Sequence, residues 1–326
     1  MSILVTGGAG YIGSHTVKYL QHKGEDVVVV DNLQSGHRSS VDVESFYKAD
    51  IRDRDSMDRI FQKHAVKEVV HFAANSIVGE SMKDPYSYYH NNVYGTLCLL
   101  DSMKKNGVYN IVFSSSAAVY GEPDRIPIVE SAKTIPTNAY GETKLVIENM
   151  MKWFEVAHGI KHVSLRYFNA AGAEGSIGED HSPETHLIPI LLQKLLGQRE
   201  KVFLFGDDYE TEDGTCIRDY VHVQDLSAAH YLSINYLRNT GKSDIFNLGN
   251  GRGYSVKEVL KSVERVTKAT IDHEVKDRRV GDPDVLIASS EKAKSVLGWN
   301  PEFGDIEKII GDAWTWHRKN PNGYKD

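Results

Sequence analysis

Short apolar runs, rich in β-branched residues, recur along the first half of the chain with segments of helical spacing between them. The runs cover residues 3–6, 27–31, 68–73, 110–114 and 162–167. Continuous apolar runs of this length are typical of strands that are buried on both faces of a parallel sheet. Between two of them, Val93, Leu97 and Leu100 repeat at helical spacing. The pattern predicts an α/β domain over residues 1–170, built as a doubly wound parallel sheet.

The pattern changes after residue 170. A loop-rich stretch over residues 170–185 is followed by a helix-like segment at 187–196 and then by irregular segments that contain Gly and Asp. We predict a smaller, mixed α/β substrate domain over residues 171–326, some segments of which return to the first domain. No flexible linker separates the two halves in the sequence, so we expect a ligand cleft between them.

Composition argues against several classes of function. The chain of 326 residues has a net charge of −7 and no long basic run, which disfavours a nucleic-acid-binding surface. No stretch reaches the roughly 18 apolar residues that a membrane span needs. The two cysteines are far apart and the 14 histidines show no HExxH or comparable spacing, so neither a disulfide framework nor a metal is expected. We expect a soluble protein of the reducing cytoplasm.

A glycine-rich turn follows the first predicted strand and opens the first predicted helix. The segment 6–13 reads TGGAGYIG and contains both GxxGxxG and GxGxxG, with Gly7, Gly10 and Gly13 at its key positions. Glycines at these positions let the turn tighten and let the backbone approach a pyrophosphate at the helix N-terminus. A purely structural turn is the alternative, and the position between strand and helix favours the nucleotide site.

Two carboxylates could complete a dinucleotide site. Asp31 ends the second predicted strand, 18 residues after Gly13, where it can accept hydrogen bonds from an adenosine ribose. A carboxylate there repels a 2′-phosphate, so Asp31 favours NAD over NADP. Asp50 and Ile51 follow the run at 46–48 and could meet the adenine, with a helix N-cap as the alternative interpretation of Asp50.

Tyr140 and Lys144 form a YxxxK pair in a predicted helix. A spacing of four places both side chains on one face, where an ammonium can lower the pKa of a phenol from about 10 toward neutrality. Such a phenol can act as a base on an alcohol. Ser116, near the end of the strand predicted at 110–114, could add a hydroxyl to the same site, with a merely polar strand end as the alternative.

Long strings of the sequence resemble the extended short-chain dehydrogenase/reductase family, and within it the nucleotide-sugar epimerases. The similarity runs nearly from end to end and includes TGGAGYIGSHT at 6–16, HFAANSIVGES at 71–81, YGETK at 140–144 and LRYFNAAGA at 165–173. It implies a Rossmann-type domain with bound NAD, a UDP-sugar substrate and a homodimer paired through two helices. The aromatic run Tyr86, Tyr88, Tyr89 and Tyr94 fits helix packing or such a dimer surface better than a nucleic-acid platform.

Carried over residue by residue, the resemblance implies three sets of site residues. The cofactor set is Gly7, Gly10, Tyr11, Ile12, Gly13, Asp31, Asn32, Asp50, Ile51, Phe72, Ala73, Asn91, Lys144 and Phe168. The catalytic set is Tyr140, Lys144 and Ser116. The UDP-sugar set is Ser116, Tyr140, Asn169, Leu187, Phe205, Arg218, Arg279, Asp282 and Leu286. Many members carry Lys where this chain has Ser76, so no cofactor contact is carried over there.

The resemblance also implies a reaction. C4 of a sugar has no neighbouring carbonyl to make its hydrogen acidic, so its inversion requires transient oxidation to a 4-keto sugar. Tyr140 would take the proton of the 4-hydroxyl while NAD takes the hydride, and UDP-galactose and UDP-glucose would interconvert. Dehydratases of the family need an acid just after the Ser116 position, where this chain has Ala117 and Ala118. The alternatives are another NAD-dependent nucleotide-sugar epimerase or dehydratase, or a non-catalytic NAD-binding protein.

Leu286 bears on the size of the substrate. In relatives the aligned residue lines the sugar pocket, and a Tyr there is associated with exclusion of an N-acetyl group at C2. The shorter Leu286 predicts that UDP-N-acetylgalactosamine is accepted as well, unless neighbouring side chains fill the space.

Overall fold

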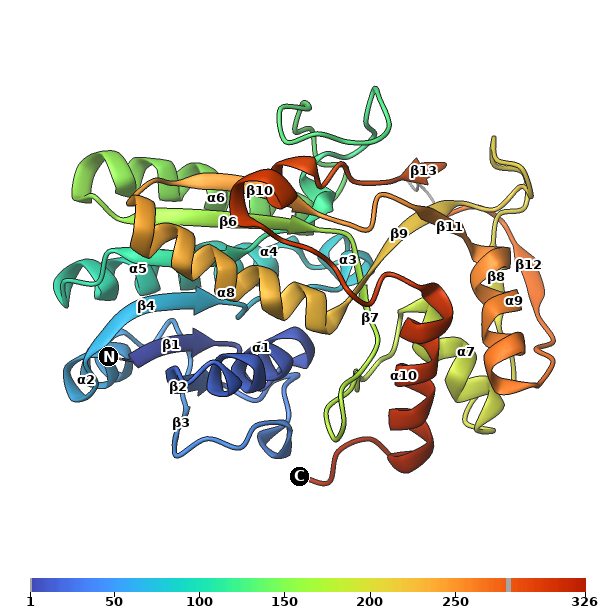
Figure 1. Ribbon diagram of the computed structural model, residues 1–326, viewed down its shortest axis with the longest axis horizontal. Coiled ribbons are helices and arrows are strands. Elements are labelled where there is room, and N and C mark those ends of the chain that lie inside the picture. The colour runs from blue at the N-terminus through green and yellow to red at the C-terminus, as the bar shows by residue number, and fades with distance from the viewer. Residues whose placement is uncertain (1, 280–282) are drawn as a thin grey trace.

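A parallel sheet of seven strands forms the centre of the molecule (Figure 1). The computed structural model describes residues 2–279 and 283–326. The strand order across the sheet is β10-β6-β5-β4-β1-β2-β3. The strands are β1 (Ser2–Thr6), β2 (Asp26–Asp31), β3 (Ser45–Lys48), β4 (Val66–His71), β5 (Asn110–Ser114), β6 (Lys161–Tyr167) and β10 (Asp244–Leu248).

Helices cover both faces of this sheet, as the predicted doubly wound fold requires. Alternate residues of β1 point to opposite faces, so Ile3 and Val5 join one apolar core while Leu4 joins the other. Helices α1 (Tyr11–His22) and α8 (Val223–Thr240) cover the first core. The second core is covered by α2 (Arg54–Lys63), α5 (Gly95–Lys105) and α6 (Ala139–His158).

The strands expected from the apolar runs are confirmed as β1, β2, β4, β5 and β6. Two further strands extend the sheet: β3 at one edge, and β10, which comes from the second half of the sequence and pairs with β6. Helix α8 also comes from that half, and it packs against α1. The C-terminal half of the chain therefore contributes to the first sheet as well as to a layer of its own.

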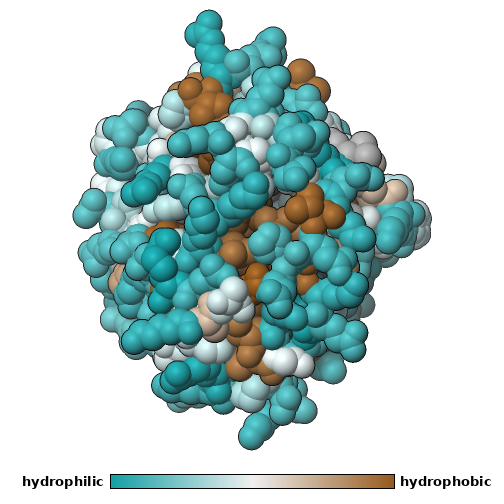
Figure 2. Space-filling model, turned by 90° about the vertical axis from the view of Figure 1, so that its right-hand side faces the viewer, coloured by the Kyte–Doolittle hydropathy of each residue, from teal (hydrophilic) through white to brown (hydrophobic). Residues whose placement is uncertain are grey.

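The remaining elements form that smaller layer, at the right of Figure 1. Helices α7 (Leu187–Leu195), α9 (Val256–Thr267) and α10 (Ile306–Lys319) enclose a third apolar core. Figure 2 shows this end of the molecule, where apolar residues gather near the middle and hydrophilic residues surround them. Its strands are β7 (Asn169–Ala171), β8 (Phe203–Phe205), β9 (Ile217–His222), β11 (Gly253–Ser255), β12 (Glu274–Lys276) and β13 (Val285–Leu286).

Short helical segments lie in the connections between these elements. They are η1 (Arg38–Ser40), α3 (Val78–Ser81), α4 (Pro85–Tyr88), η2 (Tyr89–Tyr94), η3 (Ala117–Val119) and η4 (Ala293–Leu297). Within residues 2–279 and 283–326, none of the helices combines the length and apolar composition that crossing a membrane requires.

Candidate active site

One cavity of about 1320 Å³ collects the residues that the sequence singled out. It lies at the carboxyl ends of the parallel strands, where doubly wound folds bind their ligands. Its volume exceeds the about 300–1,000 Å³ of pockets for drug-sized ligands, so a dinucleotide and a nucleotide sugar can share it. Every predicted site residue that the structure describes lines this cavity. The remaining predicted site residue, Asp282, lies outside the described residues.

The glycine-rich turn has the shape that a phosphate cradle needs. Gly7 has a φ of +71°, and a Cβ atom there would lie 2.5 Å from the backbone nitrogen of Ala73. A Cβ at Gly13 would lie 2.2 Å from the Gly7 carbonyl oxygen, so neither position tolerates a side chain. Gly10 is the N-cap of α1 and makes no side-chain cap, which leaves the first N–H groups of the helix for an anion. The residues present therefore fit the pyrophosphate of a dinucleotide.

Asp31 ends β2 at the edge of the cavity. Its two carboxylate oxygens accept hydrogen bonds from the backbone N–H groups of Ala9, at 2.9 Å, and Leu33, at 2.8 Å. These bonds fix the carboxylate, while burial raises its pKa. A carboxylate oxygen has room for more than one donor, so Asp31 can also accept from the hydroxyls of a ribose.

Asp50 is held by an ion pair rather than by a helix end. Arg52 Nη2 lies 2.6 Å from Asp50 Oδ2, and the Arg52 hydrogen bond lowers the pKa of Asp50 to about 2. The Asn32 amide donates to the same carboxylate at 3.1 Å. The N-cap of α2 is Asp53, which accepts from the backbone N–H of Ser56. The N-cap interpretation of Asp50 is therefore wrong.

Tyr140 and Lys144 lie in the first two turns of α6, as their spacing predicts. Asn138 begins this helix by accepting a hydrogen bond from the Gly141 N–H at 2.8 Å, which sets where the two side chains fall. Lys144 Nζ donates to the Ser114 carbonyl oxygen at 2.7 Å and lies 5.7 Å from the centre of the Tyr140 ring. The YxxxK pair thus faces the carboxyl end of β5.

The electrostatics of the pair differ from the sequence expectation. Burial raises the pKa of Tyr140, and a hydrogen bond with the Ser116 side chain opposes part of that increase. Burial also lowers the pKa of Lys144 to about 7, against a smaller opposite effect of the Glu148 carboxylate. A lysine that titrates near neutrality carries only part of a charge there, so the chain alone does not bring the phenol toward neutrality. The expectation that Lys144 lowers the Tyr140 pKa is therefore wrong for the chain without its cofactor.

The predicted UDP-sugar residues come from separate elements of the C-terminal half. Strand β13 pairs with β9, and this register places Leu286 beside Arg218. The Arg279 guanidinium lies 4.4 Å from the centre of the Phe205 ring, on β8. Leu187 is the first residue of α7. Two guanidinium groups thus border one end of the cavity, and guanidinium groups are well suited to bind a diphosphate.

Leu286 connects this end to the centre of the cavity. It packs against a small apolar cluster that includes Ala117 and Phe168. Ala117 follows the Ser116 hydroxyl in the chain, and Phe168 follows β6. The residue that the sequence linked to substrate size therefore lies close to the predicted catalytic set.

The similarity to known proteins agrees with this geometry. The model of the NAD dependent epimerase/dehydratase family matches residues 3–249. The chain belongs to this family. The UDP-glucose 4-epimerase of Halalkalibacterium halodurans is 59% identical, and the alignment covers 99% of this chain and 98% of that protein.

Solved structures show the same relationship for this member of the epimerase/dehydratase family. One crystal structure of a UDP-glucose 4-epimerase shares 54% identity over 100% of both chains, with a TM-score of 0.98. The UDP-glucose 4-epimerase of Bifidobacterium longum, solved in complex with NAD⁺ and UDP, shares 40% identity with a TM-score of 0.94. That comparison covers 99% of this chain and 100% of the other.

A buried ion pair beneath the YxxxK pair was not predicted. Glu148 follows Lys144 by one helical turn and is fully buried. It pairs with Arg166 on β6, with 2.5 Å between Nη2 and Oε2, and accepts from the Ser115 hydroxyl at 2.6 Å. Arg166 also donates to the Tyr120 hydroxyl at 2.9 Å. The only sequence signal was a carboxylate on the apolar face of a helix, so local patterns do not reveal this buried pair next to Lys144 in the epimerase/dehydratase chain.

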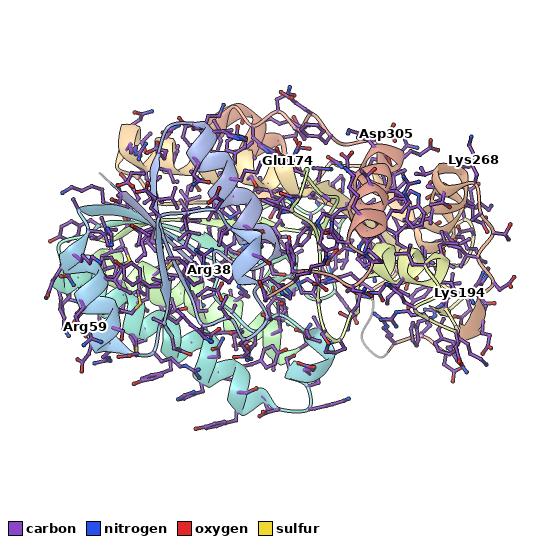
Figure 3. All side chains as sticks on the ribbon, turned by 90° about the horizontal axis from the view of Figure 1, so that it is seen from below. Arg38, Arg59, Glu174, Lys194, Lys268 and Asp305 are labelled. Carbon is purple, nitrogen blue, oxygen red and sulfur yellow. The ribbon has the colours of Figure 1, made fainter. Side chains whose placement is uncertain are left out.

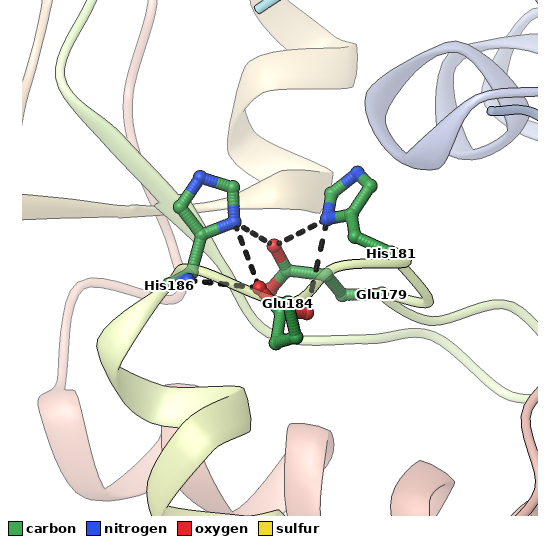
Figure 4. Close-up of side chains that lie close together, drawn as sticks. All are labelled: Glu179, His181, Glu184 and His186. Atoms are coloured by element: carbon green, nitrogen blue, oxygen red, sulfur yellow. Dashed lines mark hydrogen bonds and ion pairs between the residues drawn. The ribbon is translucent and has the colours of Figure 1, made fainter. Parts of the chain in front are cut away.

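A second group that sequence reasoning missed borders the same cavity. Glu179, His181, Glu184 and His186 all line it and lie together in the segment before α7 (Figure 4). Their signal in the sequence is the spacing ExHxxExH over residues 179–186. None of the roles expected from the epimerase/dehydratase family falls on these four residues.

Proposed function

We propose that this chain catalyses the reversible 4-epimerisation of UDP-galactose and UDP-glucose with tightly bound NAD. The observation that carries the proposal is the common cavity: the glycine-rich turn, Tyr140 with Ser116 and Lys144, and two arginines border one space. Curated and solved UDP-glucose 4-epimerases that match nearly the whole chain support the same reaction.

The chain's own residues handle the proton of the 4-hydroxyl. Tyr140 takes this proton and later returns it, and Ser116 orients the phenol through its hydrogen bond. Lys144, fixed by the Ser114 carbonyl, favours the phenolate whenever it carries its charge. NAD, when bound by the cofactor set, supplies a reversible hydride acceptor for C4. The result is a transient 4-keto sugar that is reduced again within the same site.

The predicted UDP-sugar set keeps the nucleotide in place while the sugar turns. Arg218 and Arg279 suit the diphosphate, because a guanidinium can donate two parallel hydrogen bonds to phosphate oxygens. Asn169, Leu187 and Phe205 border the same part of the cavity. Asp282 remains in the proposed set on the similarity of its motif alone. Inversion follows if the keto sugar presents its other face before reduction.

A dehydratase would need an acid beside Ser116 to protonate a leaving hydroxyl. Ala117 and Ala118 occupy that place and line the cavity. Return of the hydrogen to C4 is then the path that remains open to the 4-keto sugar. This favours the epimerase over a dehydratase of the same family.

A direct assay tests the proposed reaction. Purified protein should release NAD on denaturation and should convert UDP-galactose to UDP-glucose without added NAD. Protein that releases NAD but shows no turnover of UDP-galactose would support the non-catalytic NAD-binding alternative.

Asp31→Ala should relax the choice between NAD and NADP. The substitution removes the carboxylate at the end of β2 that would repel a 2′-phosphate. Binding of each cofactor to NAD-stripped protein, measured by fluorescence titration, should show weaker NAD binding and improved NADP binding. Unchanged affinities for both cofactors would contradict the ribose assignment of Asp31.

Leu286→Tyr should narrow the range of substrates. We propose that the unmodified chain also accepts UDP-N-acetylgalactosamine, because Leu286 is shorter than Tyr and only partly buried. Filling the pocket with a larger side chain should disfavour the N-acetylated substrates by about 1–3 kcal/mol relative to the plain hexoses. Their kcat/KM should therefore fall about 10–200-fold. UDP-galactose should be turned over as before. An unmodified enzyme inactive on UDP-N-acetylgalactosamine would contradict dual specificity.

We further propose a homodimer in the cytoplasm. Tyr86 on α4 and Trp153 on α6 have exposed fractions of 76% and 72%, on neighbouring helices. Figure 3 shows the segment with α4 and η2, in teal, at an edge of the molecule with side chains pointing outwards. Tyr88 of the same aromatic run is buried and serves helix packing. The chain has two cysteines, Cys98 and Cys216, which are buried and far apart in sequence, and this fits a reducing compartment. Sedimentation velocity should give twice the mass of one chain.

A further inference from the structure

Four potential metal ligands lie together in the segment that leads into α7. Glu179, His181, Glu184 and His186 each place one ligand atom within 4.8 Å of the others, which no other group of three or more such residues in the described chain does. The side chains of Glu179 and Glu184 are 5% and 2% exposed. Figure 4 shows both imidazole rings turned toward the two carboxylates. The proposed epimerisation uses none of the four.

The distances between these atoms suit a small divalent ion. Zn²⁺ binds imidazole nitrogen and carboxylate oxygen at about 2.0–2.2 Å, so the ligand atoms of a tetrahedral site lie about 3.3 Å apart. His181 Nδ1 lies 3.3 Å from Glu179 Oε1 and 3.8 Å from Glu184 Oε2. His186 Nδ1 lies 2.5 Å from Glu179 Oε1, and its 3.5 Å contact with Glu184 is to Oε1, the oxygen of that carboxylate that does not act as the ligand. All four ligand atoms lie within 4.8 Å of one another, so side-chain shifts of about 1–1.5 Å would bring the set to tetrahedral spacing.

Two of the ligand atoms lack the hydrogen bonds that burial demands. His181 Nδ1 and Glu184 Oε2 are buried and make ion-pair contacts within the cluster, at 3.3 Å and 3.8 Å, but neither atom makes a well-aligned hydrogen bond. The other oxygen of Glu184 accepts from the backbone N–H groups of Thr185, at 2.7 Å, and His186, at 2.8 Å. These bonds fix the carboxylate with Oε2 directed toward His181, in the way that backbone groups orient the carboxylate ligands of metal sites. A buried polar atom that lacks a well-aligned hydrogen bond is costly, and an ion would satisfy both atoms at once.

We propose that Glu179, His181, Glu184 and His186 bind one Zn²⁺ ion as a four-coordinate structural site. Two imidazoles and two carboxylates form a complete tetrahedral set for this ion, whereas Ca²⁺ and Mg²⁺ prefer oxygen ligands in larger number. This departs from the expectation that no metal binds. That expectation considered HExxH-type spacing, and the ligands here follow ExHxxExH in a loop instead of two turns of one helix.

The alternative to a metal ion is that protons on the two imidazoles balance the charge of the two carboxylates. Burial lowers the pKa of His186, but the Glu179 carboxylate more than offsets this effect, so the pKa rises to about 9. Protonated imidazoles can thus balance the two carboxylates without an ion. Zn²⁺ would have to displace these protons, as metals do at protein sites in general. The two alternatives differ in whether the cluster holds a metal tightly, which can be measured.

The position of the site indicates what the ion would do. The Tyr11 hydroxyl, in the glycine-rich turn, donates to the Gly172 carbonyl oxygen at 2.6 Å, and the Tyr11 ring meets His181 edge-on with 6.2 Å between centroids. Leu187, of the UDP-sugar set, follows His186 directly. An ion here fixes the segment 172–186 between the cofactor turn and the substrate helix. Its role is structural, and the proposal is independent of which sugar the enzyme converts.

Metal content and affinity test the site. Protein stripped with a chelator, reloaded with Zn²⁺ and desalted should retain one ion per chain by mass spectrometry of the metal. Competition with a chromophoric chelator should show at least about 100-fold weaker Zn²⁺ binding in His181→Gln and in Glu184→Gln, since each removes one of four ligands. His162→Gln is the matched control, because the buried His162 pairs with the partly buried Glu155, with 3.6 Å between Nε2 and Oε2, at a place that offers no third ligand among the described residues.

A measurement on the unmodified chain keeps the proposal testable if a variant fails to fold. Co²⁺ in place of Zn²⁺ should give the intense visible bands of tetrahedral coordination, and the metal should raise the Tm of the stripped protein. Retention of no Zn²⁺, an octahedral Co²⁺ spectrum, or equal affinity in the ligand variants and the wild type would each overturn the site. Normal metal binding by His162→Gln, together with its loss in the two ligand variants, would establish it.

Discussion

Tyr140→Phe should lower kcat by a factor of about 100 or more while the fold and NAD content stay unchanged. The substitution removes one hydroxyl from a partly buried side chain whose backbone is fixed by α6. Loss of a general acid/base usually costs about 10²–10⁴-fold in rate. The measurement is steady-state turnover of UDP-galactose, with NAD quantified in the same preparation.

Tyr109→Phe is the matched control for this prediction. Tyr109 is half exposed and does not line the cavity, so removal of its hydroxyl should leave kcat unchanged. An enzyme with Tyr140→Phe that keeps near-normal turnover would exclude the phenol from the reaction. Equal losses in both variants would point to a general effect on folding.

Glu148→Leu should destabilise the chain by about 3–5 kcal/mol. The Glu148 carboxylate is fully buried and pairs with Arg166, so its removal leaves a buried guanidinium without its counter-charge. The Ser115 hydroxyl loses its acceptor as well. The free energy of unfolding should be measured by denaturant titration of NAD-free protein, because bound cofactor would mask part of the loss.

Two further variants test whether the loss of stability comes from the unpaired buried charge and not from the removal of any carboxylate. Glu148→Leu combined with Arg166→Met removes both charges and should recover much of the lost stability. Glu307→Leu removes one partner of an exposed ion pair, with 2.7 Å between Glu307 Oε1 and Arg265 Nε, and should change stability by less than about 1 kcal/mol. A stability of Glu148→Leu within 1 kcal/mol of the wild type would contradict the role assigned to the pair.

Local sequence patterns predicted most of the central sheet. The runs that became β1, β2, β4, β5 and β6 are continuous and apolar because these strands are covered on both faces. Strand β10 was missed as a member of this sheet, since its five residues include Asp244 and Asn247 and its partner β6 lies far back in the chain. Pairing at that distance depends on tertiary packing. The domain boundary at residue 170 stays a prediction.

The candidate site was predictable where its residues lie close together in sequence. The glycine-rich turn and the YxxxK pair each follow from a short motif. The Glu148–Arg166 pair was not predictable, because its partners come from different elements and meet only in the folded chain. The Tyr140 pKa was misjudged for a related reason. Spacing shows that Lys144 lies near the phenol, but not that burial acts on both groups.

Deuterium at C4 of the substrate tests the central claim most directly. The claim is that C4 is inverted by transient oxidation, and that the hydrogen removed from C4 returns to C4 without exchange with water. UDP-[4-²H]galactose converted in ordinary water should therefore give UDP-glucose that keeps its deuterium at C4, as read by NMR and mass spectrometry. Product with hydrogen from the solvent at C4 would contradict the account, because it would show that the hydrogen leaves as a proton.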